Sequence, residues 1–170
     1  EMAVRTIFNV LGPLTNPAGA PNQVMGVFDS ELVEPIARVL GQLGSHHVMV
    51  VHADDGMDEI SICAPTRVAE LKDGEVSGYR IAPEDFGFER ADAAAIRVGS
   101  AAESLAMIRS VLDDKPGPAR DIVCLNAGAA IYTAGLADDL AGGIEQAKEA
   151  IASGRAREVL ERLVAATRAA

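Results

Sequence analysis

Residues 23–52 place the strongest constraint on the fold, because they read as a strand, a helix and a second strand. Residues 23–28 (QVMGVF) form a short apolar strand candidate, and residues 47–52 (HVMVVH) form an apolar run typical of a strand buried on both faces. Between them, apolar residues recur at helical spacing over residues 32–43, and Gly44 follows as a stop. A segment of this length suits a right-handed crossover, so we predict two parallel strands with a helix on the sheet.

The start of the predicted helix depends on two residues. Asp29 follows the first strand, and its side chain can accept a hydrogen bond from a helix N-terminus. Pro35 has no backbone N–H to donate, so it predicts either a kink or a helix that begins later than Asp29.

A β-hairpin is predicted after these elements. Residues 68–71 and 76–81 have strand patterns and flank the sequence KDGE, in which Asp-Gly is a strong turn signal. We also predict a short strand at residues 60–63, and a short helix with a connection at residues 83–99.

Helices are predicted to dominate the rest of the chain. Ser100 and Glu103 form a capping-box pattern at the first helix, and DDKPGP breaks the chain at its end. The glycines in NAGAAIYTAG (residues 126–135) have a spacing that favours close helix packing rather than catalysis. The helices are expected at about residues 100–112, 120–134, 138–152 and 154–168.

Composition supports a single α/β domain over residues 1–170. A chain near 150 residues buries roughly 68–70% of its unfolded surface, which is enough for a core. Hydrophobic residues make up 49% of the sequence but aromatic residues only 4%, so Ala, Val, Leu and Ile must build that core. This composition favours α/β over a β-sandwich. We expect a mostly parallel sheet flanked by helices, with a small hairpin.

Charge and apolar patterning exclude several classes of function. The net charge is −10, from 25 acidic and 15 basic residues, so a general surface for nucleic acid or an anionic membrane is not expected. An anionic substrate is compatible with this charge where a metal ion or helix N-termini supply positive charge. No apolar run reaches the roughly 18–20 residues that span a bilayer, and no leader is recognised, so we predict a cytoplasmic protein.

The main candidate for chemistry is HADDGMDEIS, residues 52–61, which contains the acidic loop, residues 53–59 (ADDGMDE). It follows a buried strand, where ligand sites of open α/β sheets lie. Mg²⁺ prefers oxygen ligands and is usually held by one or two carboxylates with water and substrate phosphate. Asp58 and Glu59 fit that description if the loop curls, whereas Asp54 and Asp55 are interpreted as solvated. The alternative is a wholly solvated acidic loop, with His52 in a structural hydrogen bond.

Other catalytic signatures are absent from the sequence. It contains no GxGxxG, Walker lysine, GxSxG or HExxH pattern, so no nucleophile or other catalytic residue is assigned. Cys63 and Cys124 have neither CxxC spacing nor a nearby His, so we interpret them as small buried apolar residues that fit a reducing compartment.

An irregular loop stands at the front of the sequence. RTIFNVLGPLTNPAG, residues 5–19, is too broken for a helix, because Pro13 and Pro17 each remove a backbone donor, and it lacks strand alternation. Asn9 and Asn16 are expected to bond loop backbone groups through their side chains.

Four segments in order give the chain a resemblance to a known family. They are RTIFNVLGPLTNPAG, VVHADDGMDEIS, APTRVAEL and LNAGAAIY. Together they resemble anthranilate phosphoribosyltransferase of tryptophan biosynthesis. The resemblance implies transfer of phosphoribosyl from phosphoribosyl pyrophosphate (PRPP) to the amine of anthranilate, with Mg²⁺ as cofactor. The implied fold is the C-terminal portion of the large α/β domain of a nucleoside phosphorylase/phosphoribosyltransferase-like fold.

The resemblance also assigns roles to individual residues. Asp58 and Glu59 match the acidic pair that holds Mg²⁺ near the pyrophosphate. Gly12 and Pro13 match positions that line the anthranilate channel, where Gly permits close backbone approach and Pro offers a rigid apolar face. The family's anthranilate-binding arginine lies a few residues before the position of Arg5, so Arg5 is interpreted as a structural hydrogen-bond donor.

The resemblance further implies that a second segment is needed for activity. The family's N-terminal helical domain, used for dimerisation, and the first half of its α/β domain, with a glycine-rich PRPP loop, are absent from these residues. We therefore expect this chain to be a fragment that is inactive alone. The complete protein is expected to be a homodimer that binds PRPP and anthranilate.

Two other functions are weighed against this one. A pyrimidine nucleoside phosphorylase has a similar fold and also attacks an activated ribose carbon, but it does not predict GPLTNP together with GMDE. A non-catalytic, nucleic-acid-binding relative of the transferase needs a basic groove, which a net charge of −10 disfavours.

Overall fold

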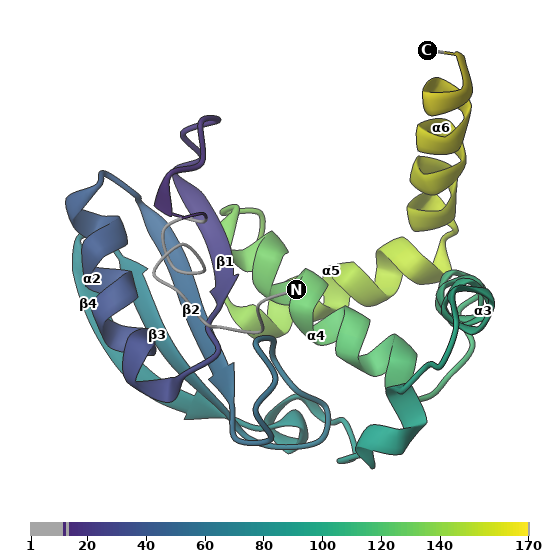
Figure 1. The fold of residues 1–170 in the computed structure, drawn as a ribbon, viewed down its shortest axis with the longest axis horizontal. Coiled ribbons are helices and arrows are strands. Elements are labelled where there is room, and N and C mark those ends of the chain that lie inside the picture. Colours follow the sequence, from purple (N-terminus) through teal and green to yellow (C-terminus); the bar gives the residue numbers. More distant parts are fainter. Residues whose placement is uncertain (1–11, 13, 170) are drawn as a thin grey trace, which may run out of the picture. The chain divides into compact units, whose positions relative to one another are not determined.

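The computed structural model describes residue 12 and residues 14–169 (Figure 1). These residues form two compact units. The first comprises residues up to Ile60 together with Pro65–Ile81, and the second comprises Ser61–Ala64 together with the residues from Ala82 onward. The single domain predicted over residues 1–170 stays a prediction.

The first unit is a four-stranded sheet with helix α2 (Val33–Gln42) packed on it. The strand order is β1-β2-β3-β4. β1 pairs with β2 in parallel, whereas β2 with β3 and β3 with β4 are antiparallel pairs. The strands are β1 (Asn22–Gly26), β2 (His47–Ala53), β3 (Thr66–Lys72) and β4 (Glu75–Ile81).

The α/β fold class is confirmed, but the sheet is mixed rather than mostly parallel. The crossover from β1 through α2 to β2 produces the predicted parallel pair. The hairpin then extends the same sheet. Its strands run antiparallel because a short turn cannot carry the chain back to the opposite end of the sheet, as a parallel pair requires.

The chain enters α2 through a short 3-10 turn, Ser30–Leu32. The Asp29 side chain accepts a hydrogen bond from the Glu31 backbone N–H at 3.0 Å, as predicted for a capping residue. α2 begins at Val33, which puts Pro35 in the first turn, where backbone N–H groups have no intrahelical partner. The predicted later start therefore accommodates the proline.

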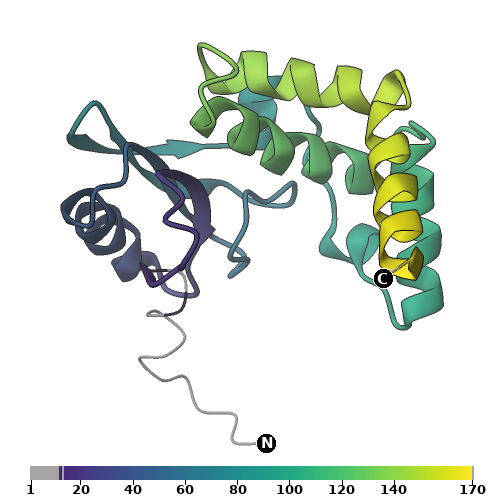
Figure 2. The same cartoon turned by 90° about the horizontal axis from the view of Figure 1, so that it is seen from above.

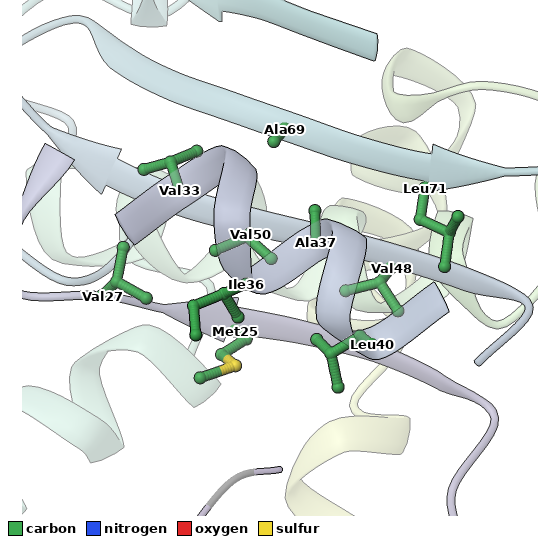
Figure 3. Packing of buried hydrophobic residues seen from close by; sticks show 10 residues of the cluster. All are labelled: Met25, Val27, Val33, Ile36, Ala37, Leu40, Val48, Val50, Ala69 and Leu71. Atoms are coloured by element: carbon green, nitrogen blue, oxygen red, sulfur yellow. The ribbon is translucent and has the colours of Figure 1, made fainter. Parts of the chain in front are cut away.

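A hydrophobic cluster holds α2 against the sheet (Figure 3). Ala37 is fully buried at the centre of the helix, above the equally buried Val48 and Val50 of β2. Burying a Val, Leu, Ile or Met side chain contributes about 1.5–3 kcal/mol, so this face stabilises the first unit strongly. The cluster comprises Met25, Val27, Val33, Ile36, Ala37, Leu40, Val48, Val50, Ala69 and Leu71.

The predicted Asp-Gly turn joins β3 to β4. Lys72 lies opposite Glu75, which leaves Asp73 and Gly74 in the turn. Both have positive φ, 53° and 83°, as a type I′ turn requires. Gly adopts this region without strain and Asp tolerates it, so the local sequence is enough to specify the hairpin.

The strand predicted at residues 60–63 is wrong. Ile60, Ser61 and Ile62 are buried, so the apolar pattern reports burial rather than strand pairing. β2 already has β1 on one side and β3 on the other, which leaves no open edge beside it. The Ile62 carbonyl instead accepts a hydrogen bond from the Ala91 N–H at 3.0 Å, outside any sheet.

The second unit is helical (Figures 1 and 2). As predicted, Ser100 Oγ accepts a hydrogen bond from the Glu103 N–H, at 3.2 Å. The Glu103 side chain accepts from the Gly99 N–H at 2.8 Å, one residue earlier than in a capping box. No helix in the described part of the chain is both long and apolar enough to cross a membrane. The helices are α3 (Ala101–Leu112), α4 (Pro118–Thr133), α5 (Leu140–Ala152) and α6 (Arg155–Ala169), preceded by 3-10 turns at Pro83–Phe86 and Ala93–Ile96.

α4 and α5 lie side by side, and glycines permit the close approach (Figure 2). A β-carbon on Gly128 would lie 2.7 Å from Cα of Ile144, and one on Gly143 would overlap the Gly128 carbonyl oxygen. Non-bonded carbon atoms prefer about 3.5–4.0 Å. The predicted use of small residues in 126–135 for close helix packing is therefore confirmed at Gly128.

Candidate functional site

The acidic loop begins at the end of β2 and curls within a few residues. The Ala53 N–H donates to the Met57 carbonyl at 2.9 Å, and the Gly56 N–H donates to the Ala53 carbonyl at 2.9 Å. Gly56 has a φ of 88°, in the left-handed region that glycine adopts without strain. The Asp54 N–H donates to the Pro65 carbonyl at 2.9 Å. The loop is therefore a hydrogen-bonded turn, which meets the condition set for Asp58 and Glu59.

Two of the four loop carboxylates are used within the fold. Asp54 forms an ion pair with Arg80 of β4, and Asp55 Oδ1 accepts a hydrogen bond from the Met57 N–H at 3.2 Å. Both residues are exposed, as predicted, but their contacts also tie down the turn.

Asp58 and Glu59 differ from these two neighbours. Both are exposed, and neither carboxylate has a hydrogen bond or ion pair within the described part of the chain. The next residue, Ile60, is only 2% exposed and anchors the exit of the loop. Two unengaged carboxylates are thus held between anchored ends, which is an arrangement that can bind a cation.

Gly26, which the sequence did not single out, supports the acidic loop from the end of β1. A β-carbon on Gly26 would lie 2.5 Å from the carbonyl carbon of Asp58 and closer still to its oxygen. No pattern in a single sequence marks this residue, because its contact is with a segment far along the chain.

His52 makes the structural hydrogen bond that was predicted for it. Its Nδ1 lies 2.8 Å from the carbonyl oxygen of Val27. Because a carbonyl can only accept, Nδ1 carries the proton. This bond ties the end of β2 to the residue that follows β1.

Gly12 is the predicted channel residue that the structure describes. It is exposed, and its carbonyl accepts a hydrogen bond from the Thr15 N–H at 3.2 Å. A β-carbon on Gly12 would meet no atom of the described residues within 4 Å. Pro13 and Arg5 lie outside the described residues.

Residues that follow Gly12 anchor the irregular loop at the front of the sequence. Leu14, which the sequence did not single out, packs against the hydrophobic cluster under α2. Asn16 Oδ1 accepts a hydrogen bond from the Ala18 N–H at 3.0 Å, which confirms the predicted side-chain bond. The same prediction for Asn9 falls outside the described residues.

A hollow of about 780 Å³ lies between α2 and the β3–β4 hairpin, but it does not include Asp58 or Glu59. Arg38 on its rim pairs with Glu34 at 2.5 Å, and Arg80 pairs with Asp54. These pairs neutralise much of its positive charge, so we assign no function to it.

The buried Cys124 is not placed for nucleophilic catalysis. Cys124 is fully buried, and this burial raises the pKa of its thiol, which keeps it in the weakly reactive neutral form. Cys63 is partly buried and does not form a disulfide. The interpretation as a small buried apolar residue is confirmed for Cys124.

Comparison with known proteins places the chain in a family. The sequence pattern described as "Glycosyl transferase family, a/b domain" matches residues 1–157. The chain belongs to this glycosyl transferase family.

Individual members of the glycosyl transferase family match nearly the whole chain. Anthranilate phosphoribosyltransferase of Thioalkalivibrio sulfidiphilus is 71% identical over 167 residues, which cover 98% of this chain and 49% of the relative. The crystal structure of anthranilate phosphoribosyltransferase from Thermus thermophilus is 43% identical with a TM-score of 0.87, over 96% of this chain and 48% of that one. The Saccharomyces cerevisiae enzyme in complex with PRPP and Mg is 26% identical with a TM-score of 0.85, over 98% and 48%.

These matches confirm the resemblance predicted from the four segments. The chain spans about half the length of the glycosyl transferase relatives it matches. These relatives carry the name of the transferase, so neither the nucleoside phosphorylase nor the nucleic-acid-binding alternative is favoured.

The predicted metal ligands Asp58 and Glu59 fit the requirements of Mg²⁺. Among the described residues, no group of three or more His, Cys, Asp and Glu side chains is placed to hold a metal ion. Mg²⁺ does not need one, because it is usually held by one or two carboxylates while water and substrate phosphate supply the remaining oxygens. Asp58 and Glu59 are exposed oxygen donors with no other partner among the described residues. Their assignment as metal ligands stays a prediction.

Proposed function

We propose that the full-length protein containing this chain is an anthranilate phosphoribosyltransferase that uses PRPP and Mg²⁺. The observation that carries the proposal is the match to relatives of that name along nearly the whole chain. The unengaged pair Asp58 and Glu59 supports it, because the pair follows the end of β2, where ligands of α/β sheets bind.

The proposed reaction joins the nitrogen of anthranilate to the anomeric carbon of PRPP. The C–N bond forms as the bond to the pyrophosphate oxygen breaks, and the amine then loses a proton. The products are N-(5-phosphoribosyl)anthranilate and pyrophosphate. An aryl amine already has a lone pair, so the reaction requires no activated Ser or Cys. This agrees with the buried, neutral thiol of Cys124.

Asp58 and Glu59 would hold Mg²⁺ near the pyrophosphate in this proposal. Bound there, Mg²⁺ would neutralise charge that develops on the departing phosphates. The backbone hydrogen bonds of the turn and the buried Ile60 hold the loop in place. Ligands that are already positioned need little reorganisation when charge develops, which is the main source of electrostatic catalysis.

Gly12 and Pro13 are proposed to form one wall of the anthranilate channel. Such a wall must be accessible to the ligand and anchored to the fold. The exposure of Gly12 and the packing of Leu14 on the hydrophobic cluster support these two conditions. For Pro13 the proposal rests on the resemblance alone.

The test is turnover by the purified full-length protein, followed as the loss of anthranilate fluorescence. We expect loss that depends on both PRPP and Mg²⁺, with release of pyrophosphate, and no turnover by residues 1–170 alone. Phosphate-dependent cleavage of uridine or thymidine without anthranilate turnover would instead identify a nucleoside phosphorylase. Salt-dependent DNA binding without either activity would identify the non-catalytic relative.

A homodimeric state and a cytoplasmic location belong to the same proposal. Light scattering of the full-length protein after size-exclusion chromatography measures the oligomeric state, and fractionation of the source cells measures the location. A monomer of full activity would remove the dimer from the proposal without affecting the proposed reaction.

A further inference from the structure

Gly26 occupies an unusual position at the end of β1. It pairs with Val51 in the parallel ladder, so its backbone is fixed by the sheet. The space that a β-carbon would fill is occupied by the main chain of Asp58, whose carbonyl carbon would lie 2.5 Å from that atom. The acidic loop therefore rests directly on the backbone of β1.

A second strand glycine shows that this close approach is specific to Gly26. Gly78 lies in β4 of the same sheet, opposite Ala69. A β-carbon on Gly78 would be 4.0 Å from the Val68 carbonyl oxygen, which is an ordinary contact. Glycine weakens a strand interior and often marks a place where another backbone approaches. Only Gly26 of these two has such an approach.

The contact at Gly26 bears directly on the predicted metal ligands. Non-bonded carbon atoms prefer about 3.5–4.0 Å, so any side chain at position 26 would push the Asp58 main chain away by on the order of 1 Å. The Asp58 carboxylate is attached to that main chain, and Glu59 follows it. A misplacement of this size can cost about 100-fold in function.

His52 holds the other side of the same junction. Its Nδ1–H donates to the Val27 carbonyl, one residue after Gly26. The end of β1 and the start of the acidic loop are thereby joined by a side chain as well as by the ladder. A displacement of the loop is therefore not relieved by movement of β1.

We propose that Gly26 is a positioning residue for Mg²⁺ binding, because its missing side chain lets Asp58 and Glu59 sit where they can share the ion with PRPP. This inference rests on the proposed function. It concerns a residue that touches neither metal nor substrate and acts through the backbone of Asp58.

The test compares Gly26→Ala with Gly78→Ala in the full-length protein. Mn²⁺ binding is measured by electron paramagnetic resonance with PRPP present and anthranilate absent, and the Mg²⁺ dependence of turnover is measured separately. We expect Gly26→Ala to raise the Kd for Mn²⁺ and the Mg²⁺ concentration for half-maximal turnover by about 10- to 100-fold, the usual cost of losing support for a metal ligand. Gly78→Ala should leave both values unchanged.

Circular dichroism and thermal unfolding establish whether each variant is folded. A folded Gly26→Ala variant that binds Mn²⁺ like the wild type would overturn the proposal, as would equal weakening by Gly78→Ala. If Gly26→Ala does not fold, the same Mn²⁺ measurement is made on His52→Leu and His52→Asn, which alter the same junction without adding a side chain at position 26. The leucine should weaken Mn²⁺ binding, and the asparagine should restore it, because its side-chain N–H can reach the Val27 carbonyl. Unchanged binding in His52→Leu would then overturn the proposal.

The Mn²⁺ measurement separates this proposal from the proposed function. A wild-type protein that binds Mn²⁺ and PRPP but does not consume anthranilate would refute the transferase reaction, while the comparison of Gly26→Ala with Gly78→Ala would still be decisive. A wild-type protein that binds no Mn²⁺ with PRPP would overturn both.

Discussion

Gly143 of α5 lies against the carbonyl oxygen of Gly128 in α4, so closely that a β-carbon at position 143 would overlap that oxygen. Both residues are buried. Ile144 lies over Gly128 in turn, with its Cα 2.7 Å from where a β-carbon on Gly128 would be. The two helices therefore meet backbone to backbone, which requires that each lacks a side chain at the contact.

Substitution of Gly143 tests this contact. We expect Gly143→Ala to lower the free energy of unfolding by about 1–3 kcal/mol, because the added methyl group overpacks the interface. Gly142→Ala is a matched control in the same helix, since its β-carbon would meet only the Asp139 side chain at 3.3 Å and Ala137 at 3.7 Å. Gly142 lies in the first turn of α5, where a β-carbon would meet no atom of α4, so this control should cost less than Gly143→Ala. Equal losses of unfolding free energy in Gly143→Ala and Gly142→Ala, measured by urea denaturation, would contradict the close contact of the two helices.

Removal of the two unengaged carboxylates should affect metal use and not folding. Asp58→Asn with Glu59→Gln should raise the Mg²⁺ concentration needed for turnover by more than the roughly 10-fold that loss of a supporting group costs. The melting temperature should not change, since neither side chain has a partner among the described residues. Asp55→Asn is the control, because it removes a loop charge but keeps the oxygen that accepts from the Met57 N–H. Normal activity of the double variant at limiting Mg²⁺ would count against the metal assignment.

The hairpin turn should be sensitive to the residue at position 74. Gly74 has a φ of 83°, and a side chain in this left-handed region costs about 1–2 kcal/mol, so Gly74→Ala should destabilise the protein by that amount. Asp73→Asn should have little effect, because Asn tolerates positive φ. Denaturant midpoints of the two variants give the comparison, and a loss in Asp73→Asn as large as in Gly74→Ala would show that the turn geometry is not the cause.

Cys124 should react with iodoacetamide only when the protein unfolds. The residue is fully buried, and burial raises the pKa of its thiol, so both access and thiolate content are reduced. Mass spectrometry after labelling in increasing urea should show modification of Cys124 that follows the unfolding curve. Rapid labelling in native buffer would contradict this.

The raised thiol pKa also predicts a dependence of stability on pH. Because the folded state retains the proton of Cys124 more strongly than the unfolded state, the contribution of this thiol is complete below the unfolded pKa of about 8.5. It is lost progressively as the pH rises from there towards the folded pKa. Cys124→Ala should flatten the plot of unfolding free energy against pH above that value. An unchanged alkaline slope would show that other groups cause the loss of stability.

Local features of this protein could be predicted from the sequence alone. The Asp-Gly turn, the Asp29 cap and the crossover helix depend on residues close together in the chain, whose conformational preferences act without the rest of the fold. The candidate metal ligands Asp58 and Glu59 were also named from the sequence, because their oxygen chemistry and place after a buried strand are local properties. Residue type and spacing therefore determined the local secondary structure and which side chains are candidate metal ligands.

Tertiary structure decided which of these residues are held in place, and by what. The strand predicted at residues 60–63 does not form, and Ile60, Ser61 and Ile62 are buried without joining the sheet. Asp54 is paired with Arg80 of β4, whereas Asp58 and Glu59 have no partner among the described residues. Gly26 matters only because Asp58 folds onto it. Contacts between segments far apart in sequence depend on the volume and position of both partners. No local sequence pattern encodes how close two such segments come in the fold.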